Sequence, residues 1–172
     1  CLSRGLGDVY KRQGLEGARA VALAPGGGRN PGMTLDAKRW PSARYAALAD
    51  ALHRAHGLAV VLTGAADDRP VTAEVRRLMR APAVDVAGQT TFGALGALLA
   101  RCALFAGNDS APMHLAAAVG IPVLAIFGPT DPAVYAPFSP RSVVLRDPRG
   151  QSTAAVGVED ALAAAGQLLP RR

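Results

Sequence analysis

The sequence GNDSAPMH (residues 107–114) lies between two apolar stretches and decides the fold class. The apolar residues 103–106 predict a short buried strand, and the Ala-rich residues 113–119 predict a helix. The segment between them is therefore a strand-to-helix turn. A helix that begins there presents free backbone N–H groups and the positive end of its dipole, which together favour a bound phosphate. Asp109, Ser110 and His114 add polar side chains to the same turn.

A helix cap is the simpler interpretation of this turn. Asp or Ser at the start of a helix commonly accepts hydrogen bonds from the first free amides. If Asp109 is the cap, His114 lies about one turn inside the helix. Three roles are then open for His114: proton donor, hydrogen-bond donor to a phosphate or sugar hydroxyl, and ordinary packing. The nearby helix N-terminus favours the neutral imidazole, and we therefore prefer the hydrogen-bonding role to acid catalysis.

Short apolar runs alternate with longer amphipathic runs along the rest of the chain. Strands are expected at residues 20–24, 58–62, 83–86, 104–106, 122–127 and 143–146, with helices between them and a last helix at 158–169. Strands that are apolar on both faces and separated by helices predict a parallel sheet covered on two sides. The expected fold class is α/β, a Rossmann-like doubly wound parallel sheet.

Ligands of such sheets bind beyond the carboxyl ends of the strands. The polar or glycine-rich turns of this chain all fall on that edge, at residues 25–40, 63–68, 87–91, 107–114 and 128–135. This coincidence predicts a binding site there. In the last of these turns, Thr130 and Asp131 are candidates to contact a ligand. A Pro-flanked turn with an Asx-type hydrogen bond explains them at least as well.

The first of these loops carries three glycines at 26–28, followed by Thr34 and Lys38. Glycines let the backbone approach an anion closely, and Lys38 can supply a positive charge. The known phosphate-loop fingerprints do not match this loop, and a solvent-exposed lysine is the competing interpretation. Trp40 is expected to pack the loop against the following helix rather than to contact a ligand.

Composition excludes several classes of function. The chain has 172 residues, half of them hydrophobic, and a net charge of +6. Its basic residues are scattered and lack interleaved aromatics, so no nucleic-acid groove is expected. The apolar run 115–127 is shorter than the ~20 residues of a membrane span. Two cysteines form no disulfide framework and no metal-ligand spacing is found, which suits a cytoplasmic protein with at most a peripheral membrane contact.

The first thirteen residues, CLSRGLGDVYKRQ, show neither strand alternation nor a helical stripe that continues beyond residue 13. They resemble translated adapter sequence at the ends of environmental reading frames. We therefore expect residues 1–13 to be non-native and residues 14–172 to form one domain.

Several segments of this domain resemble the carboxyl-terminal domain of glycosyltransferase family 9, the ADP-heptose:lipopolysaccharide heptosyltransferases. The resemblance runs from about Ala18 to the end of the chain. It is carried by KRWP (38–41), VVLTG (60–64), the segment 85–102, the block GNDSAPMHLAAAVGIPVLAIFGPTDP (107–132) and the ending 156–169. Ala111 is a departure, because the family typically has Gly there, and its methyl group narrows the approach of a phosphate.

The resemblance implies one half of a GT-B enzyme, in which two Rossmann-like domains face each other across a cleft. This half would bind the nucleotide-sugar donor, ADP-heptose or a related sugar. The amino-terminal acceptor domain, absent here, would bind the lipopolysaccharide or lipid A core and supply an acidic catalytic base. Transfer would be inverting, would need no metal or other cofactor, and would take place in the cytoplasm or at the cytoplasmic face of the inner membrane.

Motif by motif, the resemblance also implies roles for individual residues. Lys38 would contact the donor diphosphate with Thr34 beside it, and Lys38 and His114 would stabilise the leaving group. The residues implied to surround the diphosphate and sugar are Asp109, Ser110, Ala111 and His114; Asp67 or Asp68 would reach the ribose, and Thr90 would line the nucleobase pocket. Two alternatives stay open: a 2-epimerase-like nucleotide-sugar enzyme of the same fold, and a non-catalytic nucleotide- or phosphate-binding module.

Overall fold

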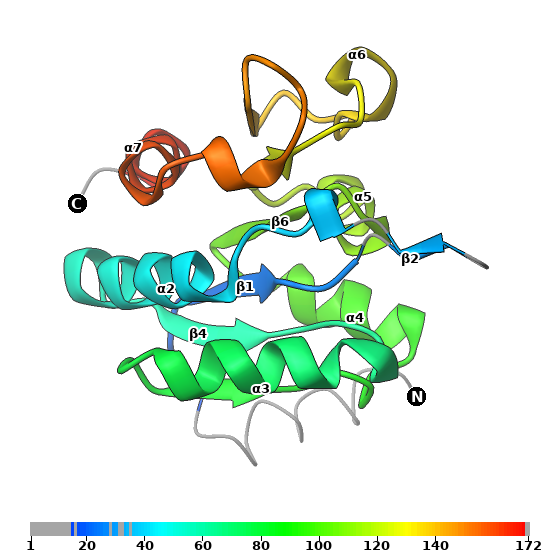
Figure 1. The fold of residues 1–172 in the computed structure, drawn as a ribbon. Helices are drawn as coiled ribbons and strands as arrows, with labels where there is room; N and C mark the ends of the chain where they lie inside the picture. Colours follow the sequence, from blue (N-terminus) through cyan, green and yellow to red (C-terminus); the bar gives the residue numbers. More distant parts are fainter. Residues whose placement is uncertain (1–14, 16, 28, 31–32, 35, 171–172) are drawn as a thin grey trace.

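The computed structural model describes residues 15, 17–27, 29–30, 33–34 and 36–170, with the side chains at 29–30 and 33–34 left out. Within these residues, six parallel strands form one sheet in the order β5-β4-β1-β6-β7-β8 (Figure 1). Their bounds are β1 (Ala20–Ala24), β4 (Ala59–Leu62), β5 (Ala83–Asp85), β6 (Leu104–Asn108), β7 (Val123–Phe127) and β8 (Ser142–Arg146). A two-stranded antiparallel ribbon, β2 (Arg29–Asn30) and β3 (Met33–Thr34), lies outside this sheet. The doubly wound parallel sheet expected from the sequence is confirmed.

Helices cover both faces of the sheet. The α-helices are α2 (Ser42–His56), α3 (Arg69–Leu78), α4 (Phe92–Leu99), α5 (Ala111–Ala118), α6 (Pro132–Tyr135) and α7 (Val158–Leu168), with 3-10 turns η1 (Asp36–Lys38), η2 (Ala66–Asp68) and η3 (Thr153–Ala155). Side chains of α2, α3 and α7 share one apolar cluster with the sheet, and side chains of α4 and α5 share the other. Strand residues alternate between the clusters: Val21 and Leu23 join the first, Ala20 and Ala22 the second. This alternation is why the strands are apolar on both faces.

The strand order places a topological switch point between β1 and β6. If the six strands are numbered in chain order, they stand in the sheet as 3-2-1-4-5-6. The chain builds the sheet outward from β1 to one side, then returns to β6 and builds it outward to the other side. The crevice beyond the carboxyl ends of such a pair is where doubly wound sheets bind ligands. Here β1 ends at Ala24, before the glycine-containing loop, and β6 ends at Asn108, before Asp109. The fold thus brings together the loop after β1 and the turn after β6, the two segments in which the sequence predicted phosphate contacts.

Two boundaries around the central turn differ from the sequence prediction. Strand β6 continues to Asn108 instead of ending at residue 106, because Gly107 still pairs with Ala24 and Asn108 with Ile126. Helix α5 begins at Ala111 rather than at residue 113. Pro112 fits this first turn because its fixed φ suits a helix and its missing N–H has no partner to lose there. The turn is therefore shorter than expected, which moves Asp109 next to the end of the strand.

Candidate functional site

Three chain segments meet at the carboxyl ends of β1 and β6: the loop after β1, the 3-10 turn η1 and the turn before α5. Lys38, at the end of η1, and Asp109, at the turn, form an ion pair in which Nζ lies 2.8 Å from Oδ2. Their side chains are only 14% and 8% exposed. The sequence interpretation of Lys38 as a solvent-exposed loop lysine is wrong, since its side chain is largely buried and is paired with Asp109.

The η1 turn that carries Lys38 is braced on both sides. Arg39 Nε donates to the Gly27 carbonyl oxygen at 2.8 Å, which ties η1 to the loop after β1. Thr153 Oγ1, in η3, donates to the Ala37 carbonyl oxygen at 3.3 Å. A backbone held between two loops gives a lysine side chain fewer conformations than a free loop would.

Asn108 connects the loop after β1 with the start of α2. Its Nδ2 donates to the carbonyl oxygens of Pro25 and Gly26 at 3.0 and 2.9 Å. Its Oδ1 accepts from the Trp40 backbone N–H and from the Tyr45 hydroxyl, both at 3.0 Å. The side chain is fully buried. Asn108 had no predicted role, although a polar residue at the end of an apolar strand is a signal that a buried hydrogen-bond network begins there.

Trp40 packs as the sequence predicted. Its indole is buried, its Nε1 donates to the Val156 carbonyl oxygen at 2.9 Å, and its ring stands edge-on to Tyr45 at a centroid distance of 5.0 Å. Burial raises the pKa of the Tyr45 phenol well above its ordinary value. The Tyr45 hydroxyl therefore keeps its proton and remains a donor to Asn108 at any physiological pH.

The start of α5 is not capped by a side chain, so the capping interpretation of this turn is wrong. Ser110 occupies the N-cap position, but its Oγ donates to the Asn108 carbonyl oxygen at 3.1 Å, and the Asp109 carboxylate pairs with Lys38. Pro112 contributes no N–H, and the Met113 N–H bonds back to the Ser110 carbonyl. The first turn therefore offers fewer free amides than the sequence pattern suggested.

Ala111 and His114 are exposed on the first turn of α5, which begins two residues after Asp109. Gly27, in the loop after β1, has a φ of +98°, and a Cβ there would lie 3.1 Å from Ser110 Cβ. The loop after β1 can therefore approach α5 this closely only with glycine at position 27.

Asp68 also holds the loop after β1. Its Oδ1 accepts from the Gly27 N–H at 3.3 Å and its Oδ2 from the Ala65 N–H at 2.9 Å. A Cβ at Gly26 would lie 2.1 Å from Asp68 Cγ, so the glycine gives room to this carboxylate. Neighbouring Asp67 is exposed. Asp68, one of the two acids proposed for a ribose, thus lies against the first loop.

The remaining candidates differ in how the structure places them. Thr90 is half-buried and directly precedes Thr91, whose Oγ1 caps α4 by accepting from the Ala94 N–H at 3.2 Å. The backbone of Thr34 lies in β3, but its side chain, like the whole of Gly28, lies outside the described part of the chain.

The turn after β7 forms the Asx-type hydrogen bond that was one of the two interpretations left open by the sequence. Asp131 Oδ1 accepts from the Ala133 N–H at 3.0 Å, which is the expected Asx-type turn. Within the described residues, the buried hydroxyl of Thr130 has no hydrogen-bond partner, and the same holds for Thr63 at the end of β4. Both threonines follow a parallel strand at its carboxyl end, the edge that carries Lys38.

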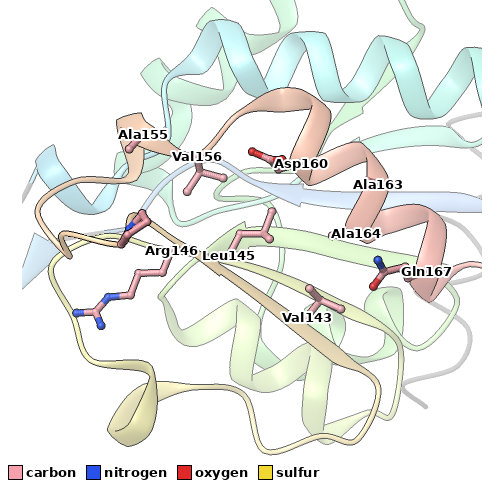
Figure 2. Close-up of a pocket in the computed structure, with 10 residues that line it drawn as sticks. Val143, Leu145, Arg146, Ala155, Val156, Asp160, Ala163, Ala164 and Gln167 are labelled. Carbon is pink, nitrogen blue, oxygen red and sulfur yellow. The ribbon is translucent and has the colours of Figure 1, made fainter.

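A cavity of about 460 Å³ lies elsewhere, between β8 and α7 (Figure 2). Its lining includes Val143, Leu145 and Ala164, with Asp160 and Gln167 from α7. None of the ligand-binding residues predicted from the sequence is among the residues that line this cavity. In the described part of the chain, no group of three or more His, Cys, Asp or Glu side chains is placed to hold a metal ion. No helix there is long and apolar enough to cross a membrane.

Comparison with known proteins shows the family. Residues 17–163 match the model of glycosyltransferase family 9 (heptosyltransferase). The chain belongs to glycosyltransferase family 9. The family 9 chain is 38% identical over 141 residues to lipooligosaccharide heptosyltransferase 2 of Haemophilus influenzae, a match that covers 79% of this chain and 39% of that protein.

Solved structures of this family share the fold. A glycosyltransferase family 9 structure from Veillonella parvula superposes with a TM-score of 0.87 at 25% identity, covering 97% of this chain and 51% of that one. The E. coli ADP-heptose lps heptosyltransferase II superposes with a TM-score of 0.83 at 28% identity, covering 95% and 50%. The family 9 chain therefore spans about half the length of these two solved structures.

Proposed function

We propose that this family 9 domain binds the nucleotide-sugar donor of an inverting glycosyltransferase, with ADP-heptose or a related sugar as donor. One observation carries the proposal: Lys38 and Asp109 meet at 2.8 Å beyond the carboxyl ends of β1 and β6. This switch point of the strand order is where a doubly wound sheet binds a nucleotide. The E. coli structure with the same fold is named for ADP-heptose and lipopolysaccharide, which supports this donor and a lipopolysaccharide acceptor.

The residues at this end of the sheet suit the chemistry of sugar transfer. When the sugar leaves the donor, negative charge develops on the nucleoside diphosphate. Lys38 supplies a fixed positive charge for it, and His114 on the first turn of α5 supplies a hydrogen-bond donor. Asp109 keeps the Lys38 ammonium in place and offers oxygens to sugar hydroxyls. The backbone of the loop after β1, with Thr34 and Asp68, completes the surroundings of the diphosphate and ribose.

We assign the rest of the reaction to the part of the relatives that lies beyond the matched region. The chain spans 39% and 44% of two curated heptosyltransferases that it matches. The acceptor site for the lipopolysaccharide core and an acidic catalytic base would belong to that other part. Transfer would then proceed without a metal, at the cytoplasmic face of the inner membrane, with a peripheral membrane contact at most.

Nucleotide preference tests the donor site. We expect the chain to bind ADP more tightly than UDP, because the E. coli structure of the same fold is named for ADP-heptose. Both should bind more tightly than inorganic phosphate, because Asp68 and Thr90 are proposed to contact the ribose and the base. Isothermal titration calorimetry with the three ligands measures this, with and without EDTA. Equal affinity for all three would indicate a plain phosphate-binding module, and binding lost on EDTA treatment would contradict metal independence.

The chain by itself should bind donor and transfer nothing. Without the proposed base, the acceptor hydroxyl is not activated and the sugar–phosphate bond stays intact. Incubation of the isolated chain with ADP-heptose and lipopolysaccharide acceptor, followed by chromatography of the nucleotide, should show no ADP release above the blank. Heptose transfer would contradict the placement of the base, and ADP release without acceptor would favour an epimerase-like enzyme.

A further inference from the structure

Asn108 uses the full hydrogen-bonding capacity of its side chain. A carboxamide has two N–H donors and one oxygen with two lone pairs. Here both donors reach carbonyls of the loop after β1, at Pro25 and Gly26, and both lone pairs are taken, by Trp40 N–H and Tyr45 O–H. The amide is fully buried, so water cannot replace any of these partners.

These contacts fix both sides of the Lys38–Asp109 pair. Asp109 directly follows Asn108 in the chain. Lys38 lies two residues before Trp40, and the Trp40 backbone N–H donates a hydrogen bond to Asn108 Oδ1. The same side chain therefore sets the end of β6 that carries the carboxylate and the end of η1 that carries the ammonium. It also holds the Gly26 carbonyl, one residue before Gly27, where an added Cβ would lie 3.1 Å from Ser110 Cβ.

We infer that Asn108 is a positioning residue: it sets the place of the Lys38 ammonium and, through that ammonium, the affinity for a nucleoside diphosphate. This inference rests on the proposed donor-binding function. Asn108 touches no ligand itself, because it is buried behind the loops it connects. An aspartate would lose both donors and turn a charge toward two carbonyls. An aliphatic residue would leave the Pro25 and Gly26 carbonyls and the Trp40 N–H without this partner, and would leave the Tyr45 hydroxyl only the Ala24 carbonyl oxygen at 3.4 Å, so few other side chains can do the same.

The test is a double-mutant cycle on ADP binding. The variants are Asn108→Ser, which is neutral and cannot bridge both loops, Lys38→Ala, and the two combined, each measured by NMR titration with ADP. If Asn108 acts through Lys38, Asn108→Ser weakens ADP binding about five- to tenfold in the parent chain and less than twofold in the Lys38→Ala background. A loss of equal size in both backgrounds, or no loss in the parent chain, would overturn the inference.

Two further variants separate positioning from general stability. Val60→Ala removes buried apolar volume from β4 without touching the site, so it should lower the Tm and leave the affinity for ADP within twofold. Tyr45→Phe deletes one of the four hydrogen bonds of Asn108 and changes the shape of the side chain very little. This variant replaces Asn108→Ser in the test if Asn108→Ser does not fold. It should weaken ADP binding two- to threefold, and again only when Lys38 is present; an unchanged affinity would count against positioning. Absence of ADP binding by the parent chain would instead overturn the proposed function itself.

Discussion

Replacing Lys38 by alanine is expected to weaken ADP binding by about 10- to 100-fold. A charge-assisted hydrogen bond contributes about 1.5–3 kcal/mol, and about 1.4 kcal/mol corresponds to a factor of ten in affinity. The substitution also removes the cation that neutralises Asp109, whose side chain is only 8% exposed. An unpaired carboxylate then stands beside the site of the diphosphate, so attraction is lost and repulsion is gained. Titration calorimetry with ADP measures the change.

The matched control removes a cation away from this edge. Arg141 is exposed just before β8, at the opposite edge of the sheet, where its Nη1 donates to the Gly120 carbonyl. Arg141→Ala changes the net charge by the same amount as Lys38→Ala and should leave ADP affinity within twofold. Equal effects of the two variants would mean that net charge alone attracts the nucleotide. An unchanged affinity of Lys38→Ala would remove Lys38 from the site.

Replacing Gly128 by alanine is expected to lower both stability and ADP affinity. A Cβ at this position would lie 2.5 Å from the Ala37 carbonyl oxygen and 3.0 Å from the Thr153 backbone nitrogen. Both are backbone atoms, so the overlap cannot be relieved by a rotamer change and η1 has to move away from β7. Overpacking of this kind costs about 1–3 kcal/mol of the free energy of unfolding. Because Lys38 follows Ala37 directly, the same shift displaces its ammonium.

Gly166→Ala is the control, because it should raise the free energy of unfolding where Gly128→Ala lowers it. Gly166 lies inside α7, where an added Cβ meets nothing within 4 Å, and its φ is not positive. Alanine there should raise the free energy of unfolding by about 0.5–1 kcal/mol, because it restricts the unfolded chain and favours the helix. Urea unfolding measures stability and calorimetry measures ADP affinity. Gly128→Ala with parental stability and affinity would show that η1 is not held against β7 in solution.

Local pattern alone was enough for the sheet and for the edge that carries the site. Apolar runs separated by amphipathic runs predicted each strand of the parallel sheet to within two residues at either end, since strand and helix periodicities are local properties of the chain. Polar turns on one edge then follow from parallel topology. The family followed from the block 107–132, and the match to family 9 confirmed it.

Contacts between distant residues decided the details of the site. The sequence allowed Asp109 to be a cap and Lys38 to be free in solvent. The fold pairs them across 71 positions of the chain, because the loops after β1 and β6 meet only once the strand order is formed. Asn108 was missed for the same reason: its partners lie 63 to 83 positions away. Residue pattern was thus sufficient for the strands, the helices and the edge at which the strands end. Which side chains meet at that edge depended on the folded chain, since such partners are chosen by packing in space rather than by spacing along the sequence.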